Sequence, residues 1–361
     1  MRRAAIPFAA MTVLVFVLPG TSSAVANNVL LFLCLMLFYI TLSLYCTPFN
    51  ALIPELGRTQ ELRINISTYI SVTYFVGTAM AYLVTMISGF LEPALGPANA
   101  FRATVAVLAV VAAICMLVAA FGIDEVKYAD TQPSSTPMGQ SVVKTFKNRE
   151  FQIFEGSDVL YWVSITMFQA GLPYYVTELM GFDDSWTFIF FAAMTAILLL
   201  FYAPVNILAK KMGKKKLVDF AFFFFCLAFA VTSVCGQLGI PSLVWGILVA
   251  VLAAVPMAML GILPQAVLAD IAEADAITSG ENREGMFYAA RTFSMTLGQT
   301  LAMILFTSLS TAAGGQMGYR LTAIVATIFC FVAGLVFTRY HEAKVLRAIG
   351  ATESASAEEG R

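Results

Sequence analysis

The sequence predicts an all-α polytopic membrane protein, because it holds more apolar surface than a soluble core could bury. Hydrophobic residues make up 60% of the 361 residues and charged residues 12%, and the mean hydropathy is +0.83. Ten mainly apolar runs approach the roughly 20 residues that a helix needs to cross a bilayer. The formal net charge of −1 gives no basic surface for nucleic acid, so we expect the lipid bilayer as partner and no nucleic acid.

The ten segments predicted to cross the membrane are residues 4–20, 27–54, 66–88, 100–123, 156–180, 186–209, 217–238, 241–267, 285–311 and 319–339. Four of them precede the longest polar interval and six follow it. This 4+6 pattern predicts an incomplete N-terminal bundle over 1–123, a cytoplasmic linker over 124–155, a six-helix C-terminal bundle over 156–339 and a cytoplasmic tail over 340–361. PMGQSVVKTFKNREFQIF in the linker is compatible with a short surface helix.

Lysine and arginine gather in alternate loops, which orients the chain. Loops after odd-numbered segments, such as TSSAVANN and GFDDS, hold almost no cations, whereas loops after even-numbered segments hold most of them. Because cytoplasmic loops collect Lys and Arg, we predict cytoplasmic termini in a cell membrane, either plasma or bacterial inner membrane. Residues 1–26 also match a secretory signal that ends in SSAVA, but Arg2 and Arg3 equally fit a cytoplasmic loop, so we interpret this segment as a retained helix.

Two stretches share one plan and indicate an internal repeat. Thr47 to Ala81 and Pro264 to Gly298 each pass from an apolar run ending near proline and an acid, through a charged loop and an arginine, to a polar-flecked helix with glycine. The later stretch joins the fourth and fifth helices of its half, and the earlier one joins the second and third helices of its own. Aligning the halves predicts that the first half lacks two helices at its beginning.

Four motifs, TPFNALIPEL, PYYVTELMG, KKMGKKK and LPQAVLADIAEADAITSGENREGMFYAARTF, occur in this order along the chain. They resemble the glycoside-pentoside-hexuronide:cation symporter family, the melibiose-carrier-like branch of the major facilitator superfamily. The resemblance covers essentially the whole chain and implies two helical bundles that rock about a central site, with this chain beginning near the family's third helix. It also implies a sugar or glycoside symporter with a sodium ion or proton as coupling cation and no other cofactor.

Several positions of the predicted substrate site depart from the family's pattern. The family's main cation-site carboxylates lie on the two helices that precede the region matched here. Its next site acid falls on Cys46 and its site tryptophan on Asn50. Its site arginine falls on Ser71 and its site lysine on Thr296, whereas Thr292 is kept. These departures put the family's ion coupling and sugar recognition in question.

The predicted helix 285–311 carries a polar face at the helical period, formed by Tyr288, Arg291, Thr292, Thr296 and Gln299. Arg291 stands where the family has a neutral amide. An unpaired arginine near the bilayer centre costs at least about 2.5 kcal/mol, so we predict that Arg291 lines a cavity or meets an acid. The alternative is that its side chain reaches the cytoplasmic headgroups.

The predicted helix 156–180 places Asp158, Trp162 and Gln169 on one face. Asp158 is the acid that lies clearly inside an apolar run, which favours a role in binding substrate or ion. The alternative is that it caps the cytoplasmic end of its helix. Pairing of Asp158 with Arg291 would neutralise both charges.

Charged residues recur at equivalent places in the two predicted loops of the repeat, namely Glu55, Arg63, Asp270, Glu273, Arg283 and Glu284. Acids of one bundle that meet bases of the other can close the cytoplasmic side of a rocking transporter. We therefore predict a cytoplasmic gate, with solvated loop charge as the alternative.

The leading hypothesis is a secondary transporter that moves a small organic solute, a sugar or glycoside, by alternating access. A carrier of lysolipid or another amphipathic solute is a second hypothesis, and a truncated, non-transporting membrane protein is a third. An enzyme is not expected, because no apolar run holds a histidine or a nucleophile paired with a base. The cysteines lie in apolar runs without paired spacing, so we expect no metal site.

Overall fold

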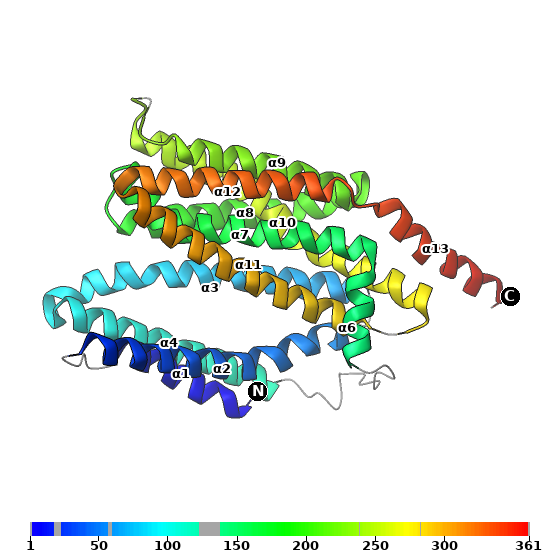
Figure 1. Cartoon of the computed structure of the whole chain (residues 1–361), viewed down its shortest axis with the longest axis horizontal. Helices are drawn as coiled ribbons and strands as arrows, with labels where there is room; N and C mark the ends of the chain where they lie inside the picture. The colour runs from blue at the N-terminus through cyan, green and yellow to red at the C-terminus, as the bar shows by residue number, and fades with distance from the viewer. Residues whose placement is uncertain are drawn as a thin grey trace. The chain divides into compact units, whose positions relative to one another are not determined.

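The computed structural model describes residues 2–17, 23–56, 60–122, 138–237, 239–281 and 283–359, and all regular structure in these ranges is helical (Figure 1). This result confirms the predicted all-α class. The chain forms two compact units. The first comprises Met1–Ile66 and Met80–Gln132, and the second comprises Ser67–Ala79 and Pro133–Arg361.

The first unit is built on α1 (Arg2–Val17), α2 (Ala24–Leu56), the ends of α3 (Gln60–Leu95) and α4 (Pro97–Gly122). Helix α1 packs against α2 and α4. Ala4 and Ala5 allow the close approach, because their small side chains are buried against Tyr45 and Ala120. The Tyr45 hydroxyl donates a hydrogen bond to the Met116 carbonyl oxygen at 2.8 Å, which ties α2 to α4.

The second unit contains α6 (Met138–Lys147), α7 (Arg149–Tyr174), the π-helix η1 (Tyr175–Leu179), α8 (Ser185–Met212), α9 (Lys214–Ser233), α10 (Ser242–Ser279), α11 (Glu284–Ala313), α12 (Gly315–Phe337) and α13 (Glu342–Glu359). Helix α7 packs against α11 and α12, and α12 packs in turn against α9. Phe168 of α7 meets Phe229 of α9 at 5.1 Å between ring centroids. The aromatic core therefore fixes α7, the helix that carries most of the candidate site.

Each of the ten predicted membrane segments coincides with a helix. Eight helices in the described part of the chain are long and apolar enough to cross a membrane, and Ala4–Val17 of α1 is a shorter apolar helix. Helix α7 falls outside this set because polar residues such as Asp158 and Gln169 lower its hydropathy. The chain is an integral membrane protein. Helix α7 of its second unit is more polar than the eight helices that meet the length and hydropathy of a membrane span.

The charged stretch after residue 267 is helical, which corrects the predicted loop. Helix α10 continues to Ser279, so Asp270 and Glu273 belong to its last turns rather than to a loop. The sequence ADIAEADAITS is rich in alanine and free of glycine and proline, which favours continuation of the helix. Gly280 ends it with a φ of 68° and donates its N–H to the Ala276 carbonyl oxygen. The connection between α10 and α11 is correspondingly short.

Helix α6 (Met138–Lys147) forms over the first part of the stretch predicted as a surface helix in the linker, whereas the part from Arg149 onward belongs to α7. Asn148 separates it from α7 and caps α7, because its Oδ1 atom accepts hydrogen bonds from the backbone N–H groups of Glu150 at 3.1 Å and Phe151 at 3.2 Å. Helix α7 thus begins at Arg149, before the start predicted at residue 156. This early start places Asp158 in the third turn.

Candidate functional site

The centre of the candidate site is an ion pair between α7 and α11. Arg291 donates from Nε to Asp158 Oδ2 at 2.8 Å and from Nη2 to Asp158 Oδ1 at 3.0 Å. The side chains are 9% and 4% exposed, respectively. Two parallel charge-assisted hydrogen bonds fix both groups, and the charges neutralise each other inside the helical unit. The Phe154 ring lies 5.7 Å from the guanidinium carbon and covers the cation.

This geometry decides two questions that the sequence left open. Arg291 is buried and paired, so the alternative that it reaches the headgroups is wrong. The alternative that Asp158 caps its helix is also wrong, because Asn148 provides the cap. Asp158 lies ten residues after Asn148, roughly 15 Å further along the helix at about 1.5 Å per residue.

Trp162 extends the site along α7. Its Nε1 donates to Asp158 Oδ2 at 3.2 Å, so the indole shares an acceptor with Arg291. The Trp162 ring stands edge-on to Tyr161 at 5.6 Å and to Tyr74 at 6.4 Å. The Tyr74 hydroxyl donates to Gln169 Oε1 at 3.4 Å. Tyr74 belongs to the part of α3 that folds with the second unit, and the sequence analysis missed it.

Helix α11 approaches α7 along a buried face formed by Phe287, Arg291, Ser294, Gly298 and Ala302. Gly298 lies directly against the backbone of α7. A Cβ atom there would lie 2.9 Å from the Val159 carbonyl oxygen and 3.4 Å from Trp162 Cβ. The absence of a side chain at residue 298 therefore lets the two helices come close enough for the ion pair to form.

Thr292 and Thr296 lie on a different face of α11 from Arg291, so the structure does not bring them to the ion pair. Both are exposed, and their hydroxyl groups donate to carbonyl oxygens of their own helix at 2.9 Å, Thr292 to Tyr288 and Thr296 to Thr292. The single polar face predicted for this helix thus divides into a buried part and an exposed part.

The remaining predicted substrate residues lie on α2 and α3. Cys46 is half-buried in the first unit, packed against the cluster around Tyr45. The side chains of Asn50 and Ser71 lie outside the described part of the structure. Their assignment to the site stays a prediction.

Two of the described gate residues, Asp270 and Arg283, form ion pairs, both within the second unit. Lys214 Nζ donates to Asp270 Oδ2 at 2.6 Å. Arg283 Nη2 donates to Asp275 Oδ2 at 2.7 Å, and Glu273 is half-buried on α10. The side chains of three further gate residues lie outside the described part, namely Glu55, Arg63 and Glu284. The gate between bundles therefore stays a prediction.

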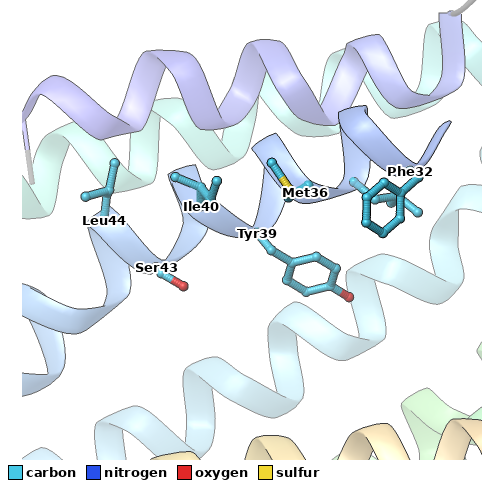
Figure 2. Close-up of a pocket in the computed structure, with 7 residues that line it drawn as sticks. Phe32, Met36, Tyr39, Ile40, Ser43 and Leu44 are labelled. Atoms are coloured by element: carbon cyan, nitrogen blue, oxygen red, sulfur yellow. The ribbon is translucent and has the colours of Figure 1, made fainter. Parts of the chain in front are cut away.

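A pocket of about 830 Å³ is lined by residues of α2. Figure 2 shows side chains from successive turns of one helix, labelled Phe32, Met36, Tyr39, Ile40, Ser43 and Leu44. Only the hydroxyl groups of Tyr39 and Ser43 interrupt the apolar character of these labelled side chains. In the sequence this stretch is a continuous apolar run, a pattern that predicts a membrane span and gives no sign of a pocket.

A family model and solved structures each match most of this chain. A family model described as MFS/sugar transport protein matches residues 1–341. The Escherichia coli fucose:proton symporter is similar in structure, with a TM-score of 0.59 and 11% identity over 94% of this chain and 84% of that chain. A bacterial homologue of the human lysosomal transporter Spinster, inward-facing and unoccupied, gives a TM-score of 0.61 and 14% identity over 93% and 81%. No curated protein matches.

Proposed function

The chain belongs to the MFS/sugar transport protein family, and on that premise we propose that it is a secondary active transporter of a sugar or glycoside. It is a transporter rather than an enzyme, and it takes a small solute across a bilayer. In this proposal the solute moves by alternating access, driven by a sodium or proton gradient. Both termini lie in the cytoplasm, and the membrane is a cell membrane.

The observation that carries the proposal is the buried Arg291–Asp158 pair beside Trp162. Charged groups inside membrane helices are costly, and they are typical of substrate and ion pathways. A sugar offers hydroxyl groups that both donate and accept, together with an apolar face of C–H groups. The pair supplies a donor and an acceptor, and an indole ring supplies an apolar surface with a polar edge.

The geometry leaves groups free for such a solute. The ion pair uses Nε and Nη2 of Arg291, so its Nη1 donors are not engaged by Asp158. Trp162 and Gln169 are half-buried, which gives this side of α7 access that the ion pair lacks. A sugar seated against Trp162 would meet the edge of the charged pair without separating the two charges.

The tryptophan content of the chain allows a direct binding test. The chain contains three tryptophans, so Trp186→Phe combined with Trp245→Phe leaves Trp162 as the only indole. We expect the emission of this variant to change and saturate when a transported sugar is titrated in. The matched control keeps the other two tryptophans and carries Trp162→Phe, and its emission should not respond.

Transport is measured with the full chain in proteoliposomes, using labelled sugars and glycosides under imposed sodium and proton gradients. The expected result is accumulation above that in empty liposomes for a sugar that also alters Trp162 emission. If no sugar enters faster than into empty liposomes and none alters the emission, the sugar assignment is wrong.

The α2 pocket supports a second candidate, a carrier of an amphipathic solute such as a lysolipid. Its apolar lining suits an acyl chain, and its volume falls within the roughly 300–1,000 Å³ typical of small-molecule sites. In this case Met36→Ser lowers lysolipid uptake several-fold, whereas Trp162→Phe leaves it unchanged. The opposite pattern favours the sugar site.

A further inference from the structure

Glu155 is a buried acid that lies beside the Arg291–Asp158 pair and is not part of it. It precedes Asp158 by one turn of α7, it is 5% exposed, and neither of its carboxyl oxygens lies in a well-aligned hydrogen bond. The charged groups that act on it within the described chain are Asp158 on its own helix and Arg291 on α11, and Ser294 of α11 also faces it. Helix α12 presents an apolar surface here, with Val336 Cγ1 at 3.8 Å from the position of a Cβ on Gly156.

The charges around Glu155 do not balance if it is ionised. One guanidinium faces two carboxyl groups, and both oxygens of Asp158 already accept hydrogen bonds from Arg291. An ionised Glu155 would be a second buried anion beside Asp158, with the Ser294 hydroxyl as its polar neighbour on α11. A bound proton removes this charge without any change in packing.

The surroundings suit a proton better than a metal cation. Hard metal cations collect several oxygen ligands, and no group of three or more His, Cys, Asp or Glu side chains that could hold a metal ion occurs among the described residues. A proton needs one carboxyl oxygen. The Glu155 carboxyl, which lies outside the Arg291–Asp158 pair, provides that oxygen.

We propose that Glu155 is the proton-binding group that couples this carrier to a proton gradient, an inference that rests on the proposed transport function. In the state described here Glu155 holds a proton and Arg291 pairs with Asp158. When the O–H bond breaks and the proton passes to water, the Glu155 carboxylate competes with Asp158 for the guanidinium. Because Trp162 donates to Asp158 Oδ2, this competition reaches the solute site.

The first experiment measures protonation without requiring transport. Infrared difference spectra of the full chain between acid and alkaline pH report the C=O stretch of a protonated carboxylic acid. Glu155→Gln mimics the protonated form and should remove the titrating band of an acid shielded from water, which lies at a higher wavenumber than the bands of solvated acids. Glu178→Gln changes an exposed acid in η1, at the far end of the same continuous helical segment, and should keep it. An unchanged band in Glu155→Gln overturns the proposal.

The second experiment measures coupling in proteoliposomes that contain a pH-sensitive dye. Solute entry into liposomes with the wild-type chain should carry protons inward. Glu155→Gln should still exchange labelled solute and still respond in Trp162 emission, but it should move no protons and fail to accumulate solute. Proton movement equal to wild type in Glu155→Gln overturns the role of Glu155 while leaving transport intact. Sodium-dependent transport without proton movement in the wild type also overturns it.

Failure of the transport function gives a different pattern. In that case the wild-type chain neither binds nor moves any solute, and the infrared band alone decides whether Glu155 holds a proton. Because Glu155→Gln keeps the size of the side chain, gel filtration and the Trp162 emission of the single-tryptophan background should match the parent protein. Loss of the carboxylic-acid band in that folded variant supports the assignment.

Discussion

Two ion pairs of the second unit have nearly the same length but different surroundings. Arg291 and Asp158 are 2.8 Å apart with side chains 9% and 4% exposed, whereas Lys144 and Glu281 are 2.6 Å apart with side chains 44% and 30% exposed. Distance does not rank them, because water and salt screen the exposed pair. Loss of one partner from a buried pair leaves an uncompensated charge, which costs about 3–5 kcal/mol. Because it is buried, the Arg291–Asp158 pair contributes more to the stability of the second unit than the exposed Lys144–Glu281 pair.

The largest effect is expected from Arg291→Gln. This change leaves Asp158 buried beside Glu155 without a cation, so we expect a loss of about 3–5 kcal/mol of unfolding free energy and loss of solute uptake. Thermal unfolding in detergent and proteoliposome uptake measure the two effects. A variant as stable as wild type would show that the pair does not organise the unit.

The double variant Arg291→Gln with Asp158→Asn separates stability from function. Removing both charges leaves no stranded ion, so most of the lost stability should return. Uptake should stay low, because the donor and acceptor for the solute are both changed. Recovery of uptake together with stability would contradict the assigned site.

A smaller effect is expected from Gly298→Ala, which adds a methyl group where α11 meets the backbone of α7. The new Cβ would lie 2.9 Å from the Val159 carbonyl oxygen, so α11 must move away and loosen the ion pair. We expect a loss of about 1–3 kcal/mol and weaker sugar-induced change in Trp162 emission. Gly285→Ala is the matched control on the same helix, because a Cβ there meets nothing within 4 Å. Equal effects of the two changes would rule out the close approach.

A smaller effect than that of Gly298→Ala is expected at the start of α9. The Glu342 carboxylate of α13 accepts hydrogen bonds from the backbone N–H groups of Lys214 at 2.7 Å and Lys215 at 3.2 Å. An acid at a helix N-terminus stabilises it, so Glu342→Gln should cost about 1 kcal/mol in thermal unfolding. Arg347→Ala removes an exposed side chain from the same helix and should cost less. A larger loss of stability in the control than in Glu342→Gln would show that the Glu342 carboxylate does not cap α9.

The smallest effect is expected from Glu281→Gln in the exposed pair. The hydrogen bond from Lys144 lowers the pKa of the Glu281 carboxyl below its ordinary value. Because the folded pKa lies below the unfolded one, the stabilisation is present above the ordinary pKa and disappears as pH falls through the lowered value. Melting temperatures of variant and wild type should differ slightly at neutral pH and low salt, and should converge in acid or high salt. A difference that salt does not reduce would contradict a screened pair.

Hydropathy predicted the helices well but did not locate their ends. Residue 267 closes an apolar run, yet α10 continues to Ser279, because the features that sustain a helix differ from those that keep it in lipid. Alanine and the acids of this stretch are compatible with a helix in water. Only Gly280 supplies a backbone conformation that ends it.

The sequence allowed several residues of the site to be predicted, but it did not show which of them touch. Asp158 and Arg291 were identified because charges inside apolar runs are rare, but they lie 133 residues apart and their contact depends on how α11 packs at Gly298. Glu155 was missed as a site residue because it precedes the apolar run. Tyr74 was missed because a tyrosine in a membrane helix is an ordinary core or interface residue until its neighbours are known.

The bond between Glu342 and the start of α9 has a consequence for synthesis. The two ends of this contact, Lys214 and Glu342, are separated by 128 residues. At about 5–20 residues per second, a ribosome completes the first turn of α9 roughly 6–26 s before it adds the acid that caps it. During this interval the amide groups of that turn must be satisfied by water or lipid headgroups. The order of translation therefore makes the beginning of α9 one of the last parts of the second unit to reach its final set of hydrogen bonds.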